Sequence, residues 1–432
     1  MNTSFFTFGC TVNNNESQEL MRKFLRNGDI IVEQGETDVI IVNSCVVTSS
    51  AENGVMQLIG RQRKKHPEAL IILTGCYNEY IKKSGKPPAV SHDIVLLDKD
   101  VPDFIGETHR LYERHAGAAA TACSSATGSA SAKVIAVTQT AFHPVRAFVQ
   151  LQNGCDNNCG YCIVPHVRGG SVSTPYNEIE GKLKELTADG FREFVLAGLN
   201  LGAYSCDGLS LIDVMERING MSEVKSIRLS SLEPMDLDDS FIKRLPGISK
   251  LSPHLHIAMQ SGCDHTLSRM GRKYTFANFD SMLNEIRNRI PGIAITTDII
   301  VGYPGESERD FEDSIKNIVR CRFSDIHIFK FSQRFGTAAA KMDGQISEHR
   351  KNERANILRG VKAQTRYNFY SAFIGKDVKV TPLRLVDAAS WEGVTAHNFP
   401  VVVRGSAPSG RITSVGITGM NAAQDAFTAV RY

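Results

Sequence analysis

The first 115 residues alternate between short apolar runs and longer stretches with apolar residues at helical spacing. The apolar runs Phe5–Phe8, Val39–Val42 and Ala69–Leu73 predict buried strands. Each run is followed by a polar turn and then by a helical pattern, of which Leu20–Leu25 is an example. Strands and helices that alternate at this length predict a doubly wound parallel sheet over residues 1–115.

A second series of alternating strands and helices extends over residues 141–368, with helical patterns at Asn177–Leu186 and Phe276–Ile290. Six strands are expected, at Ala147–Leu151, Glu193–Ala197, Ser226–Leu229, Leu255–Met259, Ala294–Ile300 and Asp325–Phe331. Six βα units predict a partial (β/α)6 barrel similar to a TIM barrel. In such barrels the active site lies at the carboxyl ends of the strands.

Two further segments flank this region. Residues 116–140 are rich in Ala, Ser and Gly and carry too few large apolar side chains for a core, so we expect a flexible linker. Cys123 lies in that segment, away from other candidate ligands. From residue 369 to residue 432 the pattern changes to short β-rich stretches separated by Gly and Pro, which predicts a small β-barrel.

The composition is that of a soluble globular protein of two or three domains: 432 residues, 42% apolar and 22% charged. The sequence has no run of about eighteen apolar residues, and its N-terminus does not resemble a secretory signal. Ten cysteines in such a chain indicate a reducing compartment and metal or redox use, so we expect a cytoplasmic protein. A net charge of +3 permits a local basic patch but does not by itself indicate a nucleic-acid partner.

Three cysteines, Cys155, Cys159 and Cys162, lie within eight residues in a C-x3-C-x2-C arrangement, which we call the central trio. Thiolates suit zinc, copper(I) and iron–sulfur clusters. A structural zinc site needs a fourth ligand, and the next candidate, His166, has no second Cys or His at zinc-finger spacing. On a cluster of four irons, three cysteines leave one iron open for a substrate or cofactor. Three buried structural cysteines are the alternative, which the Asn, Asp and Gly neighbours disfavour.

A second set, Cys10, Cys45 and Cys76, follows the three expected N-terminal strands, and we call it the N-terminal trio. The carboxyl ends of parallel strands meet at the edge where open α/β sheets bind ligands. The three thiols are therefore expected either to converge on a second iron–sulfur cluster or to be small apolar side chains in turns. Polar neighbours are candidate donors to cluster sulfurs, or turn formers: Asn13, Asn43 and Ser44.

The central trio resembles the signature of the radical S-adenosylmethionine (SAM) enzymes. The fragments FGCTVNNNES, VNSCVVTSSAE and LTGCY are similar to the N-terminal domain of the methylthiotransferases, a branch of those enzymes. The resemblance implies two [4Fe-4S] clusters, a SAM-binding cluster on the central trio and an auxiliary cluster for sulfur delivery on the N-terminal trio. It also implies that residues 369–432 form a TRAM-like RNA-binding domain, in which Trp391, His397 and Phe399 are candidates for base stacking. Packing in the small barrel is the alternative for Trp391 and Phe399.

The resemblance further implies a SAM pocket at the carboxyl ends of the barrel strands. Gly198 and Asn200 match the segment that meets the SAM amino group, and Tyr161 matches the aromatic residue whose backbone contacts adenine. Polar residues at other strand ends are weaker candidates for the same pocket: Ser230, Glu233, Gln260 and Asp298.

The sequence departs from the family pattern at three positions. Gly170 and Thr174 stand where the family has arginines, which alters any contact of that loop with RNA phosphate or the SAM carboxylate. Cys263 stands where relatives often have serine, and is either a spectator thiol or a residue near the active site.

The implied reaction replaces a hydrogen on an unactivated carbon by sulfur. In the family, a reduced cluster on the central trio cleaves SAM into methionine and a 5′-deoxyadenosyl radical, which takes the hydrogen. The auxiliary cluster then supplies the sulfur, and a second SAM supplies the methyl group.

The segments RLSSLEP (Arg228–Pro234), HLHIAMQSGCDHTLSRMGRKYT (His254–Thr275) and FGTAAAKM (Phe335–Met342) are most similar to the threonylcarbamoyladenosine branch. This implies methylthiolation of C2 of N6-threonylcarbamoyladenosine at position 37 of tRNA. The alternatives are the same reaction on isopentenyladenosine tRNA or on a ribosomal-protein aspartate, and a non-catalytic RNA-binding protein that holds zinc. Expected partners are the tRNA anticodon stem-loop and a flavodoxin- or ferredoxin-type electron donor, with no membrane, and the chain is expected to be a monomer.

Overall fold

The computed structural model consists of two compact units, which we describe separately. The first contains residues 1–140 with residues 166–168, and the second contains residues 141–165 and 169–432. The structure describes residues 1–32, 35–85, 94–122, 145–387, 389–406, 408, 411–421, 423 and 426–431. Most of the segment expected to be a linker, Cys123 included, lies outside these described residues.

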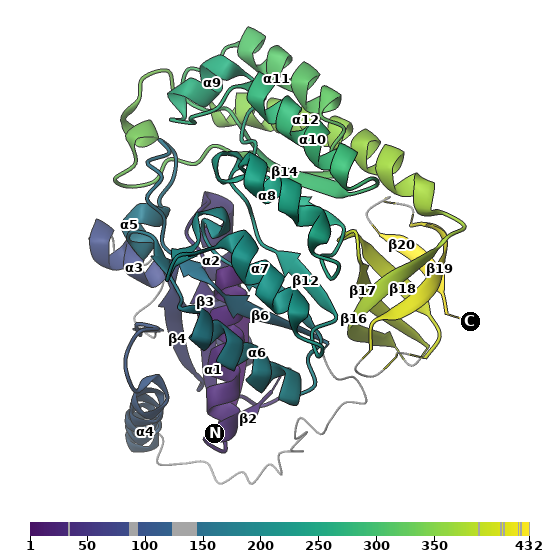
Figure 1. The fold of residues 1–432 in the computed structure, drawn as a ribbon. Helices are drawn as coiled ribbons and strands as arrows, with labels where there is room; N and C mark the ends of the chain where they lie inside the picture. The colour runs from purple at the N-terminus through teal and green to yellow at the C-terminus, as the bar shows by residue number, and fades with distance from the viewer. Residues whose placement is uncertain are drawn as a thin grey trace. The chain divides into compact units, whose positions relative to one another are not determined.

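Five parallel strands form the sheet of the first unit (purple to blue in Figure 1), in the order β2-β1-β3-β4-β5. Their bounds are β1 (Asn2–Thr7), β2 (Ile30–Ile31), β3 (Val39–Ser44), β4 (Leu70–Gly75) and β5 (Ile94–Leu96). Every residue of β3 and β4 is buried, as is typical of central strands that are covered on both faces. This strand order is that of a doubly wound sheet, so the expected fold class of this part is confirmed.

Four helices accompany this sheet: α1 (Thr11–Arg26), α2 (Ser49–Lys65), α3 (Cys76–Ser84) and α4 (Phe104–Ala122). Phe24 of α1 is fully buried and packs edge-on against Phe5 and Phe104. Helix α4 ends at Ala122, so the first seven residues of the segment expected to be a linker are helical instead. The reason is their alanine content, because alanine is the strongest helix former and needs no core to favour a helix.

The second unit contains a parallel partial barrel built from two three-stranded sheets, in the orders β12-β9-β6 and β13-β14-β15. The bounds are β6 (Arg146–Gln150), β9 (Glu193–Ala197), β12 (Ser226–Leu229), β13 (His254–His256), β14 (Ala294–Val301) and β15 (Asp325–Lys330). Bridges between Ile227 and Leu251 and between Leu232 and Ile257 join the two sheets. Among the described strands, β6 and β15 are the outer members, so the barrel is open between them. The expected six-stranded architecture is confirmed.

Helices and short strands complete this unit. The helices are α5 (Val164–Arg168), whose residues 166–168 are counted with the first unit, and α6 (Tyr176–Ala188), α7 (Leu211–Gly220), α8 (Asp239–Arg244), α9 (Asp264–Arg269), α10 (Phe276–Arg289), α11 (Glu308–Arg320) and α12 (Glu348–Tyr370). The short strands are β7 (Gln152–Asn153), β8 (Val172–Ser173), β10 (Ser205–Cys206) and β11 (Leu209–Ser210). Single turns of 3₁₀ helix occur at Leu201–Ala203, Pro234–Asp236, Leu245–Gly247, Ala338–Lys341 and Ser371–Phe373.

The barrel strands have two faces of different character. Leu255, Ile295 and Ile326 belong to the large apolar core that the strands share with the surrounding helices. Because side chains alternate along a strand, the residues next to them point to the opposite face. We call this inner face of the barrel the lumen.

A closed barrel of five strands ends the chain (yellow in Figure 1), in the order β16-β17-β18-β20-β19. The bounds are β16 (Asp377–Asp387), β17 (Ser390–Thr395), β18 (Pro400–Arg404), β19 (Thr413–Met420) and β20 (Phe427–Val430). Tyr370, at the end of α12, packs inside this barrel with Trp391 and Phe399. The domain boundary expected at residue 369 therefore falls within α12, and the contacts place both barrels in one unit.

Candidate functional site

The central trio lies on the loop between β7 and α5, close after the first barrel strand. The backbone N–H of Cys155 donates to the carbonyl of Gly169 (3.1 Å), which closes the loop on itself. Gly154 has a φ of +68°, and a Cβ at this position would lie 1.8 Å from the carbonyl oxygen of Gly170. Only glycine permits this close approach, so the local sequence forms a tight turn that carries the three thiols.

The thiols of the central trio lie within electrostatic reach of one another. Burial raises the pKa of Cys162 to about 12, and the neighbouring Cys159 and Cys155 act in the same direction. Burial also raises the pKa of Cys155. The thiolate is the form that binds metal, and a cationic metal centre compensates the charge that burial disfavours. The donor set therefore fits an iron–sulfur cluster, for which thiolates are the usual protein ligands.

The cysteine turn is clamped from outside at Gly160. Its N–H donates to the carbonyl of Met270 (2.8 Å), and its carbonyl accepts from the N–H of Ala339 (2.7 Å). A Cβ on Gly160 would lie 2.7 Å from the hydroxyl of Tyr303, which is fully buried. Three distant segments of the chain thus fix the position of this turn.

Arg272 connects the central trio to the residues at the strand ends. Its guanidinium pairs with Glu233 and lies 3.5 Å from both the sulfur of Cys159 and the hydroxyl of Tyr161. It also donates to the carbonyl of Ala258 (3.0 Å). The structure therefore brings Tyr161 and Glu233 together through an arginine that sequence reasoning does not find. Its neighbours are distant in sequence, and the surrounding letters GRKY carry no metal or phosphate motif.

Gly198, Asn200 and Ser230 form a second polar group at the strand ends. The N–H of Gly198 donates to Ser230 Oγ (3.1 Å), and the N–H of Asn200 donates to Oε1 of Gln152 (2.8 Å). The side-chain oxygen of Asn200 is buried and accepts no hydrogen bond from the described residues. Burial raises the pKa of Asp236 nearby to about 6, with Glu233 acting in the same direction. A buried acceptor beside a carboxyl group fits a cationic ligand group.

Gln260 and Asp298 meet through their backbones. The N–H of Gln260 donates to the carbonyl of Asp298 (2.8 Å), and Gln260 has a φ of +65°. The side chain of Asp298 contacts His256 and His327, from the two strands that flank β14. Burial alone would raise the pKa of Asp298, but the two imidazoles hold it below its ordinary value. Asp298 is therefore a carboxylate in the lumen.

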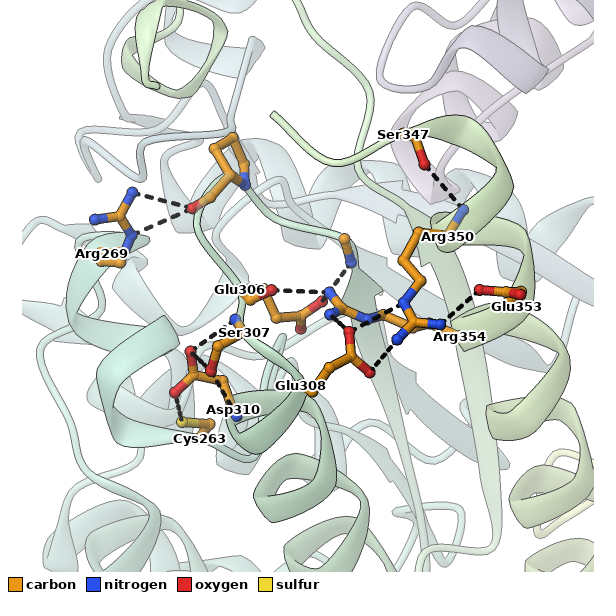
Figure 2. Close-up of polar contacts among 12 residues, drawn as sticks. Cys263, Arg269, Glu306, Ser307, Glu308, Asp310, Ser347, Arg350, Glu353 and Arg354 are labelled. Carbon is orange, nitrogen blue, oxygen red and sulfur yellow. Dashed lines mark hydrogen bonds and ion pairs between the residues drawn. The ribbon is translucent and has the colours of Figure 1, made fainter. Parts of the chain in front are cut away.

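The turn after β14 is fixed by ion pairs to Arg354, of which the one with Glu306 is buried on both sides (Figure 2). Glu306 Oε2 accepts from the N–H of Gly302 (2.7 Å) and from Arg354 of α12 (2.7 Å), and Arg354 also pairs with Glu308. Ser307 caps α11 together with Asp310. These contacts give the turn a structural role.

Cys263 is part of the same framework. Its side chain is buried, and its thiol lies 3.4 Å from Oδ1 of Asp310, to which it donates (Figure 2). Burial raises the pKa of this thiol, which favours the protonated form that makes this contact. Its contacts are those of a helix-terminus residue.

Each cysteine of the N-terminal trio lies at the carboxyl end of a strand. Cys10 is the N-cap residue of α1 after β1, Cys45 follows β3 directly, and Cys76 follows β4 as the first residue of α3. Burial raises the pKa of Cys45 to about 11, and Cys76 and Cys10 act in the same direction. The three thiols of adjacent strands therefore lie within electrostatic reach of one another.

Buried polar side chains lock the loops that carry these thiols. The amide of Asn13 donates to Asn43 Oδ1 and to the carbonyl of Ser44 (both 3.1 Å). Ser44 Oγ donates to the carbonyl of Thr74 (2.5 Å), and the thiol of Cys10 lies 3.2 Å from Asn13 Oδ1. These polar neighbours bond mainly to one another and hold the three loops in register.

The aromatic candidates of the C-terminal barrel are mostly in its core. Trp391 and Phe399 are buried, at 0% and 1% exposure, so neither presents a face for base stacking. His397 packs against Phe373, and burial lowers its pKa to about 4.

Comparison with known proteins identifies the class. Residues 149–318 match the family described as the Radical SAM superfamily, and residues 2–96 match the one described as Uncharacterized protein family UPF0004. The barrel and its cysteine turn thus define a radical SAM enzyme, and this domain implies a [4Fe-4S] cluster and SAM.

Curated relatives identify the family. The chain is 35% identical to a protein of Thermotoga maritima named threonylcarbamoyladenosine tRNA methylthiotransferase MtaB, over 87% of this chain and 85% of the relative. It is 32% identical to the protein of the same name from Bacillus subtilis, over 96% and 93%. It is also 32% identical to a tRNA-2-methylthio-N(6)-dimethylallyladenosine synthase of Acetivibrio thermocellus, over 87% and 79%. The chain belongs to the radical SAM tRNA methylthiotransferases. Among the described residues, no helix has the length and apolar character needed to cross a membrane.

Proposed function

We propose that this enzyme methylthiolates C2 of N6-threonylcarbamoyladenosine at position 37 of tRNA. The observation that carries the proposal is the pair of cysteine trios at strand ends, in a chain 35% identical to a relative named for this nucleoside. Relatives named for threonylcarbamoyladenosine and for dimethylallyladenosine differ little in identity. The choice of substrate therefore rests on the resemblance of the segments Arg228–Pro234 and His254–Thr275 to the first group.

In the proposed site, the central trio holds the SAM-binding [4Fe-4S] cluster, which supplies the reductive cleavage of SAM when bound. The protein fixes this cluster through the clamp at Gly160. Arg272, 3.5 Å from the sulfur of Cys159, places a positive charge beside the thiolates and stabilises their negative charge.

The proposed SAM contacts use both polar groups at the strand ends. The unsatisfied oxygen of Asn200 supports a contact with the SAM amino group, with Gly198 and Ser230 fixing the segment around it. The backbone of Tyr161 contacts adenine. The remaining members of the proposed pocket are Glu233, Gln260 and Asp298.

We assign the auxiliary cluster, the proposed source of sulfur, to the N-terminal trio. Three buried or turn-borne thiols on adjacent strands, in loops locked by Asn13, Asn43 and Ser44, support this assignment. A second cluster with three protein ligands would leave one iron open for a sulfur ligand.

The C-terminal barrel is the proposed contact with the tRNA anticodon stem-loop. Its exposed basic side chains support a phosphate-binding surface: Lys376, Lys379, Arg384, Arg404, Arg411 and Arg431. On the basis of the family resemblance, we further propose that a flavodoxin or ferredoxin donates the electrons. We also propose that the enzyme is a monomer and lies in the cytoplasm.

The test is to incubate the reconstituted enzyme with SAM, a reductant and one of two anticodon stem-loops, which differ only in the nucleoside at position 37. Mass spectrometry of the digested RNA should detect the 2-methylthio product from the threonylcarbamoyl stem-loop. A product from the isopentenyl stem-loop alone would overturn the substrate assignment. A colourless protein with stoichiometric zinc and no product would instead support the non-catalytic zinc-binding alternative.

A further inference from the structure

Three polar side chains from adjacent strands meet on the lumen face of the barrel: His256 of β13, Asp298 of β14 and His327 of β15. The same carboxylate oxygen, Asp298 Oδ1, lies 3.2 Å from His256 Nε2 and 3.3 Å from His327 Nδ1. The two imidazole rings are stacked, with centroids 5.1 Å apart. Because ionised carboxylates only accept hydrogen bonds, each imidazole donates to Asp298 from the nitrogen that faces it.

This arrangement fixes His256 and leaves one nitrogen of His327 available. Thr296 Oγ1 lies 2.9 Å from His256 Nδ1 and 2.9 Å from His254 Nε2, so both nitrogens of His256 are engaged. In contrast, Nε2 of His327 has no hydrogen-bond partner in the part of the chain that the structure describes, and the side chain is 49% exposed. His327 lies on β15, at the open edge of the barrel. A ligand that enters the lumen therefore meets this nitrogen.

The cluster of histidines and Asp298 lies close to the cysteine end of the barrel. Arg272, beside Cys159, also donates to the carbonyl of Ala258, which is two residues beyond His256 along the chain. Ala258 lies just after the end of β13, and two extended residues span about 7 Å. The cluster therefore lies deeper in the lumen than the contact between Arg272 and Ala258 at the strand end.

The geometry does not favour a metal ion at this position, although one donor atom from each side chain lies within 4.8 Å of the others. The planes of the two imidazole rings are only 22° from parallel. The in-plane lone pairs of nearly parallel, stacked rings do not converge on one ion. Asp298 also already accepts from both rings through one oxygen.

We infer that His327, held by Asp298 and His256, hydrogen-bonds the polar substituent on N6 of the substrate adenosine and is a specificity-determining residue. This inference rests on the proposed function. C2 and N6 of adenine flank N1 on one edge of the base, so a lumen that presents C2 to the SAM end also holds the N6 substituent.

The threonylcarbamoyl group carries urea, hydroxyl and carboxylate atoms that can pair with Nε2 of His327, whichever proton state the ring adopts. An isopentenyl group has no polar atom and would cover that nitrogen without pairing it. One unpaired buried polar group discriminates between ligands by about tenfold to a hundredfold. His327 should therefore contribute a factor of this size to the preference for the polar substrate.

The experiment compares the reconstituted wild-type enzyme with H327F, H327Q and the control H349F. His349 is on α12, 84% exposed, and pairs only with Glu353 among the described residues. For each protein, kcat/KM is measured on the threonylcarbamoyl and isopentenyl stem-loops, and the affinity for each stem-loop is measured without reductant. The melting temperature and zinc content are recorded in parallel.

We expect H327F to lower the selectivity ratio by about tenfold or more, mainly through KM and stem-loop affinity, while H327Q keeps most of the ratio and H349F keeps all of it. If H327F is unstable, a second variant, H327A, takes its place. The selectivity ratio and stem-loop affinity of H327Q are then compared with those of H327A. An unchanged ratio, in a wild-type enzyme that prefers the threonylcarbamoyl stem-loop, overturns the inference and leaves the proposed function intact. A wild-type preference for the isopentenyl stem-loop overturns the proposed function itself. Stoichiometric zinc that is lost in H327F would overturn the inference in favour of a metal site.

Discussion

Arg228 of the β/α barrel donates from Nη2 to the carbonyl oxygen of Thr395 in the C-terminal barrel, at a distance of 2.9 Å. The same side chain pairs with Glu193 (3.1 Å), which also accepts from Thr381 of the C-terminal barrel (2.8 Å). Arg228 and Glu193 are 4% and 1% exposed. A buried ion pair therefore joins the two barrels at the amino-terminal end of the lumen.

Replacing Arg228 by methionine should destabilise the protein strongly. Glu193 would remain buried with Arg146 as its main cationic partner, and breaking one side of a buried pair costs about 3–5 kcal/mol. The free energy of unfolding in urea measures the loss. The control K225M changes an exposed lysine that immediately precedes β12 and should shift this free energy by less than about 0.5 kcal/mol. If R228M also lost less than about 0.5 kcal/mol of unfolding free energy, the Arg228–Glu193 pair would not be what joins the two barrels.

The C-terminal barrel should become less stable as the pH is lowered, because of His397. Burial lowers the pKa of His397 to about 4 in the folded chain, and Arg228 acts in the same direction, whereas an unfolded histidine titrates near 6.5. Protonation then favours the unfolded chain, so the stabilisation is complete above pH 6.5 and is lost as the pH falls towards 4. The loss is at most about 3 kcal/mol. Hydrogen-exchange protection of residues 391–403 should decline across this window in the wild type and in H349N, and much less in H397N.

Alanine at Gly154 should prevent the central turn from forming. Its Cβ would lie 1.8 Å from the carbonyl of Gly170, and alanine at a φ of +68° is strained. Iron per chain after reconstitution should fall from about eight to about four, with loss of SAM cleavage. Gly181 of α6 provides the control, because a Cβ there meets no atom within 4 Å and G181A should keep both properties. Full iron content in G154A would contradict the proposed role of this turn.

The sequence predicts those features of the fold and site that depend on local pattern. Apolar runs followed by cysteines are enough to place Cys10, Cys45 and Cys76 at strand ends. A residue in the turn that follows a strand necessarily lies at the carboxyl end of that strand. The end of α4 at Ala122 was not evident from the pattern, because alanine adds too little apolar surface to mark a core but has the highest helix propensity.

Features that depend on packing between distant segments could not be predicted in this way. Arg272 reaches Cys159 and Glu233 only because three loops converge, and no spacing in the sequence encodes that. His327 is one of several polar residues on β15, and its role depends on Asp298 of the neighbouring strand. Trp391 illustrates the reverse case, because an aromatic residue in a small barrel is ambiguous until its burial is known.

The most direct test of the central claim compares two triple variants of the reconstituted enzyme, C155A/C159A/C162A and C10A/C45A/C76A. The first should lose SAM cleavage altogether. The second should still release 5′-deoxyadenosine from SAM but form no methylthiolated nucleoside, as read by mass spectrometry. Methylthiolation by the second variant would contradict the account, because sulfur would then be delivered without the N-terminal trio.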